Sequence, residues 1–273
     1  MAELSPFVAS VSTRIARRAA DYAAEIDRGG HPERDLLDIF NTHVEAVLAE
    51  YNPPGVRRAV EGLVFDHLYT AARHPARDEE GWRVPSALLA ALVAAEVEFR
   101  GPLRLSAIQS TVLAEVYERL GPRLSRAKLP SHAVLCYRRA MALYRMNEDV
   151  DGEDRCGLEL ARARTRTHPR GPRRWAGHIS DVLCGYGYRP FWLLGWVAAQ
   201  LVIFTATGLL LAGNASTAET VYMCVTSFLN PLGPGDTQNL HAAARPLFAV
   251  ESWAGTVSMS VFFALLVRKW FRM

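Results

Sequence analysis

Two long apolar stretches near the C-terminus constrain this chain more than any other feature. Residues 191–212 contain no charged side chain, and residues 246–267 contain one, Glu251, close to the start. At about 1.5 Å per residue, a helix over either stretch would cross a hydrocarbon core of about 30 Å. The alternative, a buried core helix of a soluble protein, fits the lengths and the charged flanks less well. The sequence therefore predicts two transmembrane helices.

Charge is distributed very unevenly along the 273 residues, although the formal net charge is only +3. Residues 1–190 hold 27 of the 31 Lys and Arg and 25 of the 28 Asp and Glu, whereas residues 191–273 hold only seven charged side chains. This division indicates a water-exposed part followed by a membrane part. Acids interleave with the arginines, so we expect no nucleic-acid partner, and the 50% hydrophobic content excludes intrinsic disorder.

Basic residues cluster on one side of the two apolar stretches. Seven arginines lie between Arg162 and Arg189, and residues 268–272 add three basic side chains, whereas residues 213–245 hold one arginine. The positive-inside rule then predicts a two-span protein of the cell membrane with both termini in the cytoplasm. The first residues lack the basic and apolar regions of a signal peptide, which agrees with a cytoplasmic N-terminal part.

An all-α fold with three regions follows from these patterns. We expect a helical cytoplasmic domain over residues 1–168, a linker with an interfacial helix over 169–190, and a transmembrane module over 191–273. In the linker, Trp175, Ile179 and Val182 recur at helical spacing, which predicts an amphipathic helix on the inner surface of the lipid bilayer.

The cytoplasmic region shows helical periodicity and no alternating strand pattern. Turn residues predict breaks near residues 29–30, 53–54, 74–84, 101–102 and 127–130. Helix pairs that begin near Pro32, Pro85 and Pro130 recur at uneven spacing. In outline they resemble tetratricopeptide or HEAT repeats.

The connection between the two apolar stretches contains a short helix. Ser216 and Glu219 form a capping box that predicts a helix start at Thr217, and Pro231 predicts its end near Asn230. Such a helix is about 20 Å long, too short to cross the bilayer. We therefore predict a re-entrant helix that enters the membrane and ends partway, the alternative being an ordinary extracellular loop.

The second apolar stretch carries small side chains every four residues. These are Ser252, Thr256, Ser260 and Ala264. A stripe of this kind permits close packing between helices or lines a narrow path.

Several short motifs occur in an order that is known from one family. They are Gly185-Tyr186-Gly187-x-Arg189-Pro190, Thr226-Ser227-Phe228, Gly233-x-Gly235-Asp236 and Glu251-x-x-x-Gly255. Together, residues 185–270 resemble the two-transmembrane pore module of the potassium-channel superfamily, in particular the bacterial modules behind pentapeptide-repeat or helical cytoplasmic domains. The resemblance implies a homotetramer that conducts a monovalent cation. It also implies a pore lined by Thr226, Ser227, Asn230, Leu232, Gly233, Pro234, Gly235 and Asp236.

The chain departs from the family at the filter. The family sequence is Thr-Thr-hydrophobic-Gly-Tyr-Gly-Asp, whereas residues 230–236 are Asn-Pro-Leu-Gly-Pro-Gly-Asp. Selectivity in such filters depends on successive backbone carbonyls, and Pro234 fixes its own φ and favours an extended Gly233. Two functions stay open. One is a cation channel with a cytoplasmic helical regulatory domain, and the other is a non-conducting, membrane-anchored interaction or sensor protein.

Enzyme chemistry has little support in the sequence. The four cysteines are widely spaced with no CxxC pair, and the histidines are scattered, so neither a zinc site nor a disulfide framework is indicated. A membrane enzyme would need catalytic groups in the apolar stretches, where only Glu251 is available. We expect no catalytic site, no cofactor and no metal site.

Overall fold

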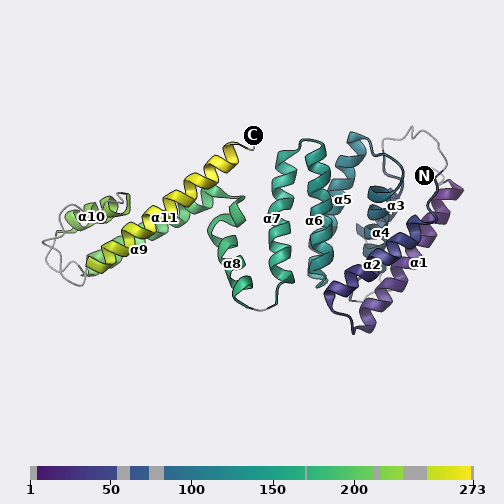
Figure 1. Cartoon of the computed structure of the whole chain (residues 1–273), viewed down its shortest axis with the longest axis horizontal. Helices are drawn as coiled ribbons and strands as arrows, with labels where there is room; N and C mark the ends of the chain where they lie inside the picture. Colours follow the sequence, from purple (N-terminus) through teal and green to yellow (C-terminus); the bar gives the residue numbers. More distant parts are fainter. Residues whose placement is uncertain are drawn as a thin grey trace. The chain divides into compact units, whose positions relative to one another are not determined.

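The computed structural model describes residues 5–53, 62–73, 83–169, 171–211, 216–229 and 245–271. Across these residues the chain is helical with no β-strand, which confirms the predicted all-α class. The chain divides into two compact units, Met1–Arg174 and Trp175–Met273. Figure 1 shows the helices coloured along the sequence.

Seven α-helices make up the first unit within its described residues. They are α1 (Pro6–Arg28), α2 (Glu33–Leu48), α3 (Asp66–Arg73), α4 (Ser86–Arg100), α5 (Ala107–Arg126), α6 (Pro130–Met146) and α7 (Val150–Thr167). The predicted breaks near residues 29–30, 101–102 and 127–130 coincide with helix ends, and the breaks at 54 and 74–82 lie outside the described residues. Pro32, Pro85 and Pro130 do stand at the starts of α2, α4 and α6, where a missing amide hydrogen costs nothing.

Helix α4 is the centre of the first unit. Every side chain from Leu88 to Glu98 is buried, and the helix packs against α1, α2, α3 and α5. A helix that is apolar on all sides is stable in water only when other elements cover it completely. The apolar run over residues 87–95, which is too short to span a bilayer, is therefore a core helix.

Two carboxylates on α4 enter this core with hydrogen-bond donors around them. Glu96 is fully buried and accepts hydrogen bonds from the Tyr117 hydroxyl at 2.9 Å and from Nε and Nη2 of Arg139 at 3.0 and 3.1 Å. Glu98 accepts a hydrogen bond from the Phe65 amide at 2.9 Å. These bonds join α4 to α5, to α6 and to the turn before α3.

The two turns that connect α5, α6 and α7 have the same conformation. Lys128 and Glu148 have positive φ angles of 61° and 58°. In the first turn the Leu129 amide donates to the Leu124 carbonyl at 2.9 Å, and the equivalent bond in the second turn is 3.0 Å long. This arrangement is the Schellman motif. The equal turns place the three helices side by side, as Figure 1 shows.

The α5–α6 pair carries part of the residue pattern of a tetratricopeptide unit. The pattern W-x₂-L-G-x₂-Y…A-x₃-F is met, with Tyr or Leu at three aromatic positions, by the buried residues Tyr117, Leu120, Gly121, Leu124, Ala133 and Tyr137. Glycine is required at position 121, because a Cβ there would lie 2.5 Å from the Tyr137 ring. The repeat-like arrangement of the first unit stays a prediction.

The second unit holds the long apolar helices. Its elements are α8 (Pro172–Cys184, which begins in the first unit), a 3₁₀ turn (Gly185–Gly187), α9 (Pro190–Leu211), α10 (Thr217–Leu229) and α11 (Arg245–Trp270). Helices α9 and α11 contain spans, Phe191–Leu210 and Pro246–Val267, that are long and apolar enough to cross a membrane. Only 11% and 17% of these spans are buried within the chain, in contrast to α4.

Helix α8 forms at the place where an amphipathic helix was predicted. None of its residues is buried, and Trp175, Ile179 and Val182 are 72%, 52% and 69% exposed. Its apolar residues are thus not used for packing within the described chain. A position on a bilayer surface remains a prediction.

Candidate functional site

The short helix α10 packs against both long helices of the second unit. The Ser216 hydroxyl accepts a hydrogen bond from the Glu219 amide at 3.2 Å, so the predicted N-terminal cap is present. The 13 residues of α10 are about 20 Å long, less than the thickness of a hydrocarbon core. Figure 1 shows α10 alongside the hairpin of α9 and α11. The structure thus contains a half-length helix beside two full-length ones.

The contact between α10 and α11 brings their backbones together. A Cβ on Gly255 would lie 2.2 Å from the Phe228 carbonyl oxygen, so any side chain at this position would force the helices apart. Next to this contact, the buried Ser227 hydroxyl donates to the Phe248 carbonyl at 3.2 Å. Gly255, a predicted structural residue, and Ser227, a predicted pore residue, therefore fix α10 on α11.

The contact between α10 and α9 is also made at a glycine. A Cβ on Gly208 would lie 3.1 Å from the Cys224 sulfur and 3.5 Å from a methyl carbon of Thr220. The Cys224 thiol is buried and faces the Phe204 carbonyl at 4.0 Å. Small side chains on α9 thus leave room for α10.

Helix α10 contacts the two long helices at different distances from their adjoining ends. Thr220 and Cys224 of α10 meet α9 at Gly208, three residues from the end at Leu211, and Phe228 in the last turn meets α11 at Gly255, ten residues from the start at Arg245. At 1.5 Å per residue these positions are about 5 and 15 Å from the adjoining helix ends. The last turn of α10 therefore contacts α11 further from the adjoining helix end than Thr220 and Cys224 contact α9.

The glutamate side chain of Glu251 lies inside this apolar module. Its side chain is fully buried, and neither carboxyl oxygen makes a hydrogen bond of normal geometry to another described residue. The Cys224 thiol is its polar neighbour. An ionised carboxylate in such a place is costly, so Glu251 marks a polar point where α10 and α11 meet.

The entrance to α9 is a left-handed turn. Gly185, Tyr186 and Gly187 have successive φ angles of 53°, 52° and 84°, a region that favours glycine. The Arg189 guanidinium then lies 5.4 Å from the centre of the Trp192 ring, and Pro190 begins α9. The predicted entry residues therefore form one compact turn before the first long helix.

The predicted filter lies mostly outside the described residues. Of the pore residues, Thr226 and Ser227 are in the last turns of α10, where the Thr226 hydroxyl donates to the Tyr222 carbonyl of its own helix at 2.8 Å. The others, which lie outside the described residues, are Asn230, Leu232, Gly233, Pro234, Gly235 and Asp236.

The small-residue stripe on α11 is not the face that packs within the chain. Thr256, Ser260 and Ala264 are exposed and Ser252 is only half-buried. The buried residues of α11 are instead Phe248, Glu251, Gly255 and Ser258. Close packing of the stripe against another helix of the same chain, one of its two expected uses, is therefore not seen within the described residues.

One polar contact across the hairpin was missed by the sequence reasoning. The Ser258 hydroxyl donates to Oε1 of Gln200 on α9 at 3.0 Å. Gln200 is the one amide side chain in the stretch 191–212, and a polar residue in an apolar span usually has a partner on a neighbouring helix. This signal was available in the sequence.

Comparisons with known proteins assign no family to the chain. No protein-family model, no curated protein and no solved structure matches it. Among the residues that the structure describes, no three His, Cys, Asp or Glu side chains gather into a group that could hold a metal ion.

Proposed function

We propose that the chain is one subunit of a tetrameric cation channel, with α9, α10 and α11 as the membrane module and α1–α7 as a cytoplasmic regulatory domain. The observation that carries the proposal is the placement of α10, a helix too short to cross a bilayer that packs against two helices long enough to do so. A helix that enters from one side and ends partway is the basic element of a pore loop. One hairpin cannot enclose a pore, so several copies around an axis are needed.

The distribution of charged residues along the sequence predicts how the proposed channel is oriented in the membrane. Basic residues before α9 and after α11 favour cytoplasmic termini, which puts the segment after α10 on the outer side. In that arrangement, Asp236 attracts cations at the outer mouth, and Gly233 and Gly235 supply backbone carbonyls to the filter.

The exposed small-residue stripe on α11 is a surface that other subunits of the proposed tetramer could contact. Thr256, Ser260 and Ala264 face away from α10 and are not covered within the chain. Small side chains allow another helix to approach closely, or leave space along a central axis. In the tetramer this face is directed to the other subunits or to the pore.

A non-conducting, membrane-anchored sensor or interaction protein is the second candidate. The observation that favours it is the presence of Pro231 and Pro234 where the filter of the resembling family has Thr and Tyr. In this case α9–α11 anchor the helical domain, and the short helix α10 has no transport role.

The deciding experiment measures cation flux through the purified full chain in lipid vesicles, together with cross-linking to count the chains. We expect four chains and a flux of monovalent cations. Asp236→Asn should reduce this flux at low ionic strength more than the matched change Glu219→Gln, because only Asp236 is assigned to the mouth. A verified tetramer that conducts under no ionic or voltage condition would overturn the channel proposal.

A repaired filter separates the two candidates further. The triple variant Asn230→Thr, Pro231→Thr and Pro234→Tyr restores the family residues on the same scaffold. If the wild type does not conduct and the triple variant conducts potassium, the module has a channel fold. The natural protein is then the non-conducting sensor or interaction protein.

A further inference from the structure

Gln200 carries an amide side chain in the middle of the apolar span on α9. It lies nine residues from Phe191 and ten residues from Leu210, the two ends of that span. At 1.5 Å per residue, Gln200 is about 14 Å from either end. In a bilayer with a hydrocarbon core of about 30 Å this level is the centre, where no water is available to a polar group.

One half of the Gln200 amide has a partner within the chain. Oε1 accepts a hydrogen bond from the Ser258 hydroxyl of α11 at 3.0 Å, and no other hydrogen bond of Gln200 to a described residue is present. The NH₂ group of the amide offers two further donors. If the amide is turned round, Ser258 contacts the nitrogen and the oxygen is left instead. Gln200 is half-buried, so the free half of its amide is accessible from outside the chain.

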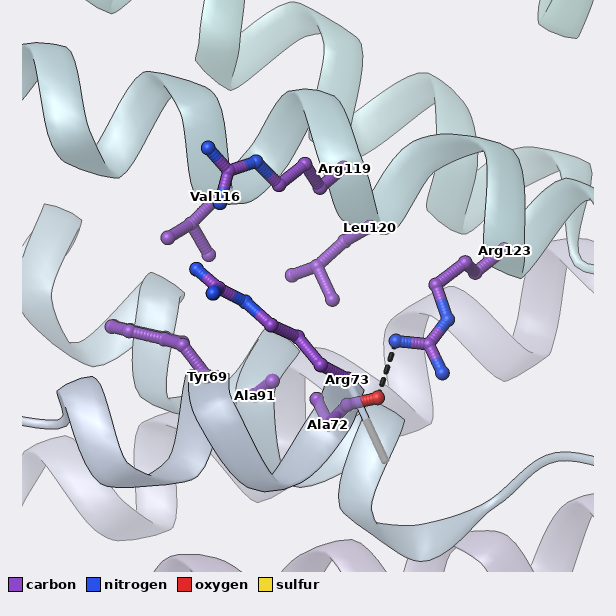
Figure 2. A pocket seen from close by; sticks show the side chains of 8 residues that line it. All are labelled: Tyr69, Ala72, Arg73, Ala91, Val116, Arg119, Leu120 and Arg123. Carbon is purple, nitrogen blue, oxygen red and sulfur yellow. Dashed lines mark hydrogen bonds between the residues drawn. The ribbon is translucent and has the colours of Figure 1, made fainter. Parts of the chain in front are cut away.

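The first unit shows how a polar side chain at a helix contact is normally satisfied. The Arg123 guanidinium of α5 donates a hydrogen bond to the Ala72 carbonyl in the last turn of α3, as Figure 2 shows. Water can satisfy the other donors of such a half-buried side chain in the first unit. The free half of the Gln200 amide lacks this partner in hydrocarbon, where an unpaired amide group is costly.

A second polar group without a partner lies near the same level on α11. The exposed Ser260 hydroxyl makes no hydrogen bond to a described residue, whereas the Thr256 hydroxyl donates to the Ser252 carbonyl of its own helix at 2.8 Å. Ser260 is about 3 Å along the helix axis from Ser258, the residue that contacts Gln200. An amide N–H and a hydroxyl oxygen are complementary as donor and acceptor.

The geometry of α11 prevents these two groups from meeting within one chain. Successive residues of an α-helix turn by about 100°, so Ser260 points about 200° away from Ser258. Because Ser258 faces α9 of its own chain, Ser260 faces away from it. The free half of the Gln200 amide and the Ser260 hydroxyl can therefore pair only between two copies of the chain.

We propose that the Gln200 amide of one chain donates a hydrogen bond to the Ser260 hydroxyl of a second copy. This bond holds α9 of one chain against α11 of the next. The inference rests on the proposed function for the position of α9 and α11 in the bilayer. A contact between two different faces repeats around an axis and closes a ring, as a channel of several subunits requires.

Energy transfer between donor-labelled and acceptor-labelled full chains in lipid vesicles tests this contact. The dyes are attached at the N-terminus, and the chains are diluted with increasing amounts of lipid. Gln200→Leu keeps the approximate size of the side chain and removes the amide, so it should raise the dissociation constant about three- to tenfold, the range for hydrogen bonds between membrane helices. Ser260→Ala should cause a loss of the same size. The double variant should lose little more than either single variant, because both changes break the same bond.

The matched control is Thr256→Val. Thr256 is exposed on the same helix as Ser260, but its hydroxyl has a partner within the helix, so this variant should associate as the wild type does. Circular dichroism should confirm that all variants fold. Wild-type association of Gln200→Leu, additive losses in the double variant or an equal loss in Thr256→Val would overturn the proposal.

The same vesicles separate this inference from the channel function. Cation flux through chains whose association does not depend on Gln200 would contradict this inference alone. Association that depends on Gln200, in chains that conduct no cation, would contradict the channel function alone. No energy transfer between wild-type chains would overturn both.

Discussion

Glu96 is one of two carboxylates on the buried helix α4, and two other helices supply its donors. The fully buried side chain has the Tyr117 hydroxyl and the Arg139 guanidinium as partners. The Arg139 guanidinium also lies 4.3 Å from the centre of the Phe99 ring. One side chain therefore determines how α4, α5 and α6 are aligned.

Removing this carboxylate should destabilise the first unit strongly. Glu96→Ala leaves the half-buried Arg139 and the buried Tyr117 without their acceptor, so we expect a loss of about 3–5 kcal/mol in the free energy of unfolding. The matched change Glu115→Ala breaks an exposed pair with Arg119 and should cost less than about 1 kcal/mol. Denaturant unfolding followed by circular dichroism measures both losses. Similar losses for the two variants would show that the buried pair contributes no more to the free energy of unfolding than the exposed pair does.

His132 makes the stability of the same unit depend on pH. Its ring is fully buried, and Nε2 lies 2.7 Å from the Tyr22 hydroxyl, which donates its own hydrogen to the Leu36 carbonyl. The hydrogen-bond pattern therefore assigns the proton of the neutral ring to Nε2, and Nδ1 has no partner among the described residues. Burial lowers the pKa of His132 to about 4.

The unfolded chain binds a proton at His132 more readily than the folded chain does. The contribution to stability is complete above pH 6.5 and is lost as the pH falls from about 6.5 to about 4, by about 3 kcal/mol in total. Unfolding curves over this range should show the loss, and His132→Gln should flatten it. The exposed His31→Gln provides the control, and a slope that survives in His132→Gln would assign the effect to other groups.

At the scale of the helices, the contact at Gly255 determines how closely α10 packs on α11 in the second unit. Gly255→Ala places a methyl group against the Phe228 carbonyl and should destabilise the packing of α10 by about 1–3 kcal/mol. Gly195→Ala is the matched control, because a Cβ at that position on α9 meets nothing within 4 Å. In a Cys184→Ser background, a thiol reagent should label Cys224 faster in Gly255→Ala than in the wild type. Equal labelling rates would contradict this role of Gly255.

The sequence predicts those parts of the fold that depend on local chemistry. The bounds of α10 follow from Ser216 and Pro231, which act within a few residues, and the two long helices follow from their composition. The partners of Glu96 lie 21 and 43 residues away, so no local pattern indicates them. The stripe of small residues did not indicate the packed face of α11, because its regular spacing says nothing about which face a neighbour occupies.

At the scale of the whole molecule, the two units differ in how much apolar helix surface they leave uncovered. This difference can be tested directly. Helices α9 and α11 expose most of their apolar surface within the chain, whereas α4 is covered by the other helices of its unit. The full chain should therefore stay with the membrane fraction after alkaline carbonate extraction, and a variant that ends at residue 168 should be released. Recovery of the full chain in the soluble fraction would contradict a membrane role for the second unit.

The backbone contact between Gly255 and Phe228 determines how motion can pass through the second unit. Side chains between helices normally absorb small displacements by changing rotamers, but two backbones in contact have no such freedom. A tilt of α11 must therefore carry the end of α10 with it. The C-terminal part of α11 and the last turn of α10 are in this way mechanically linked at the point where the Gly255 and Phe228 backbones meet.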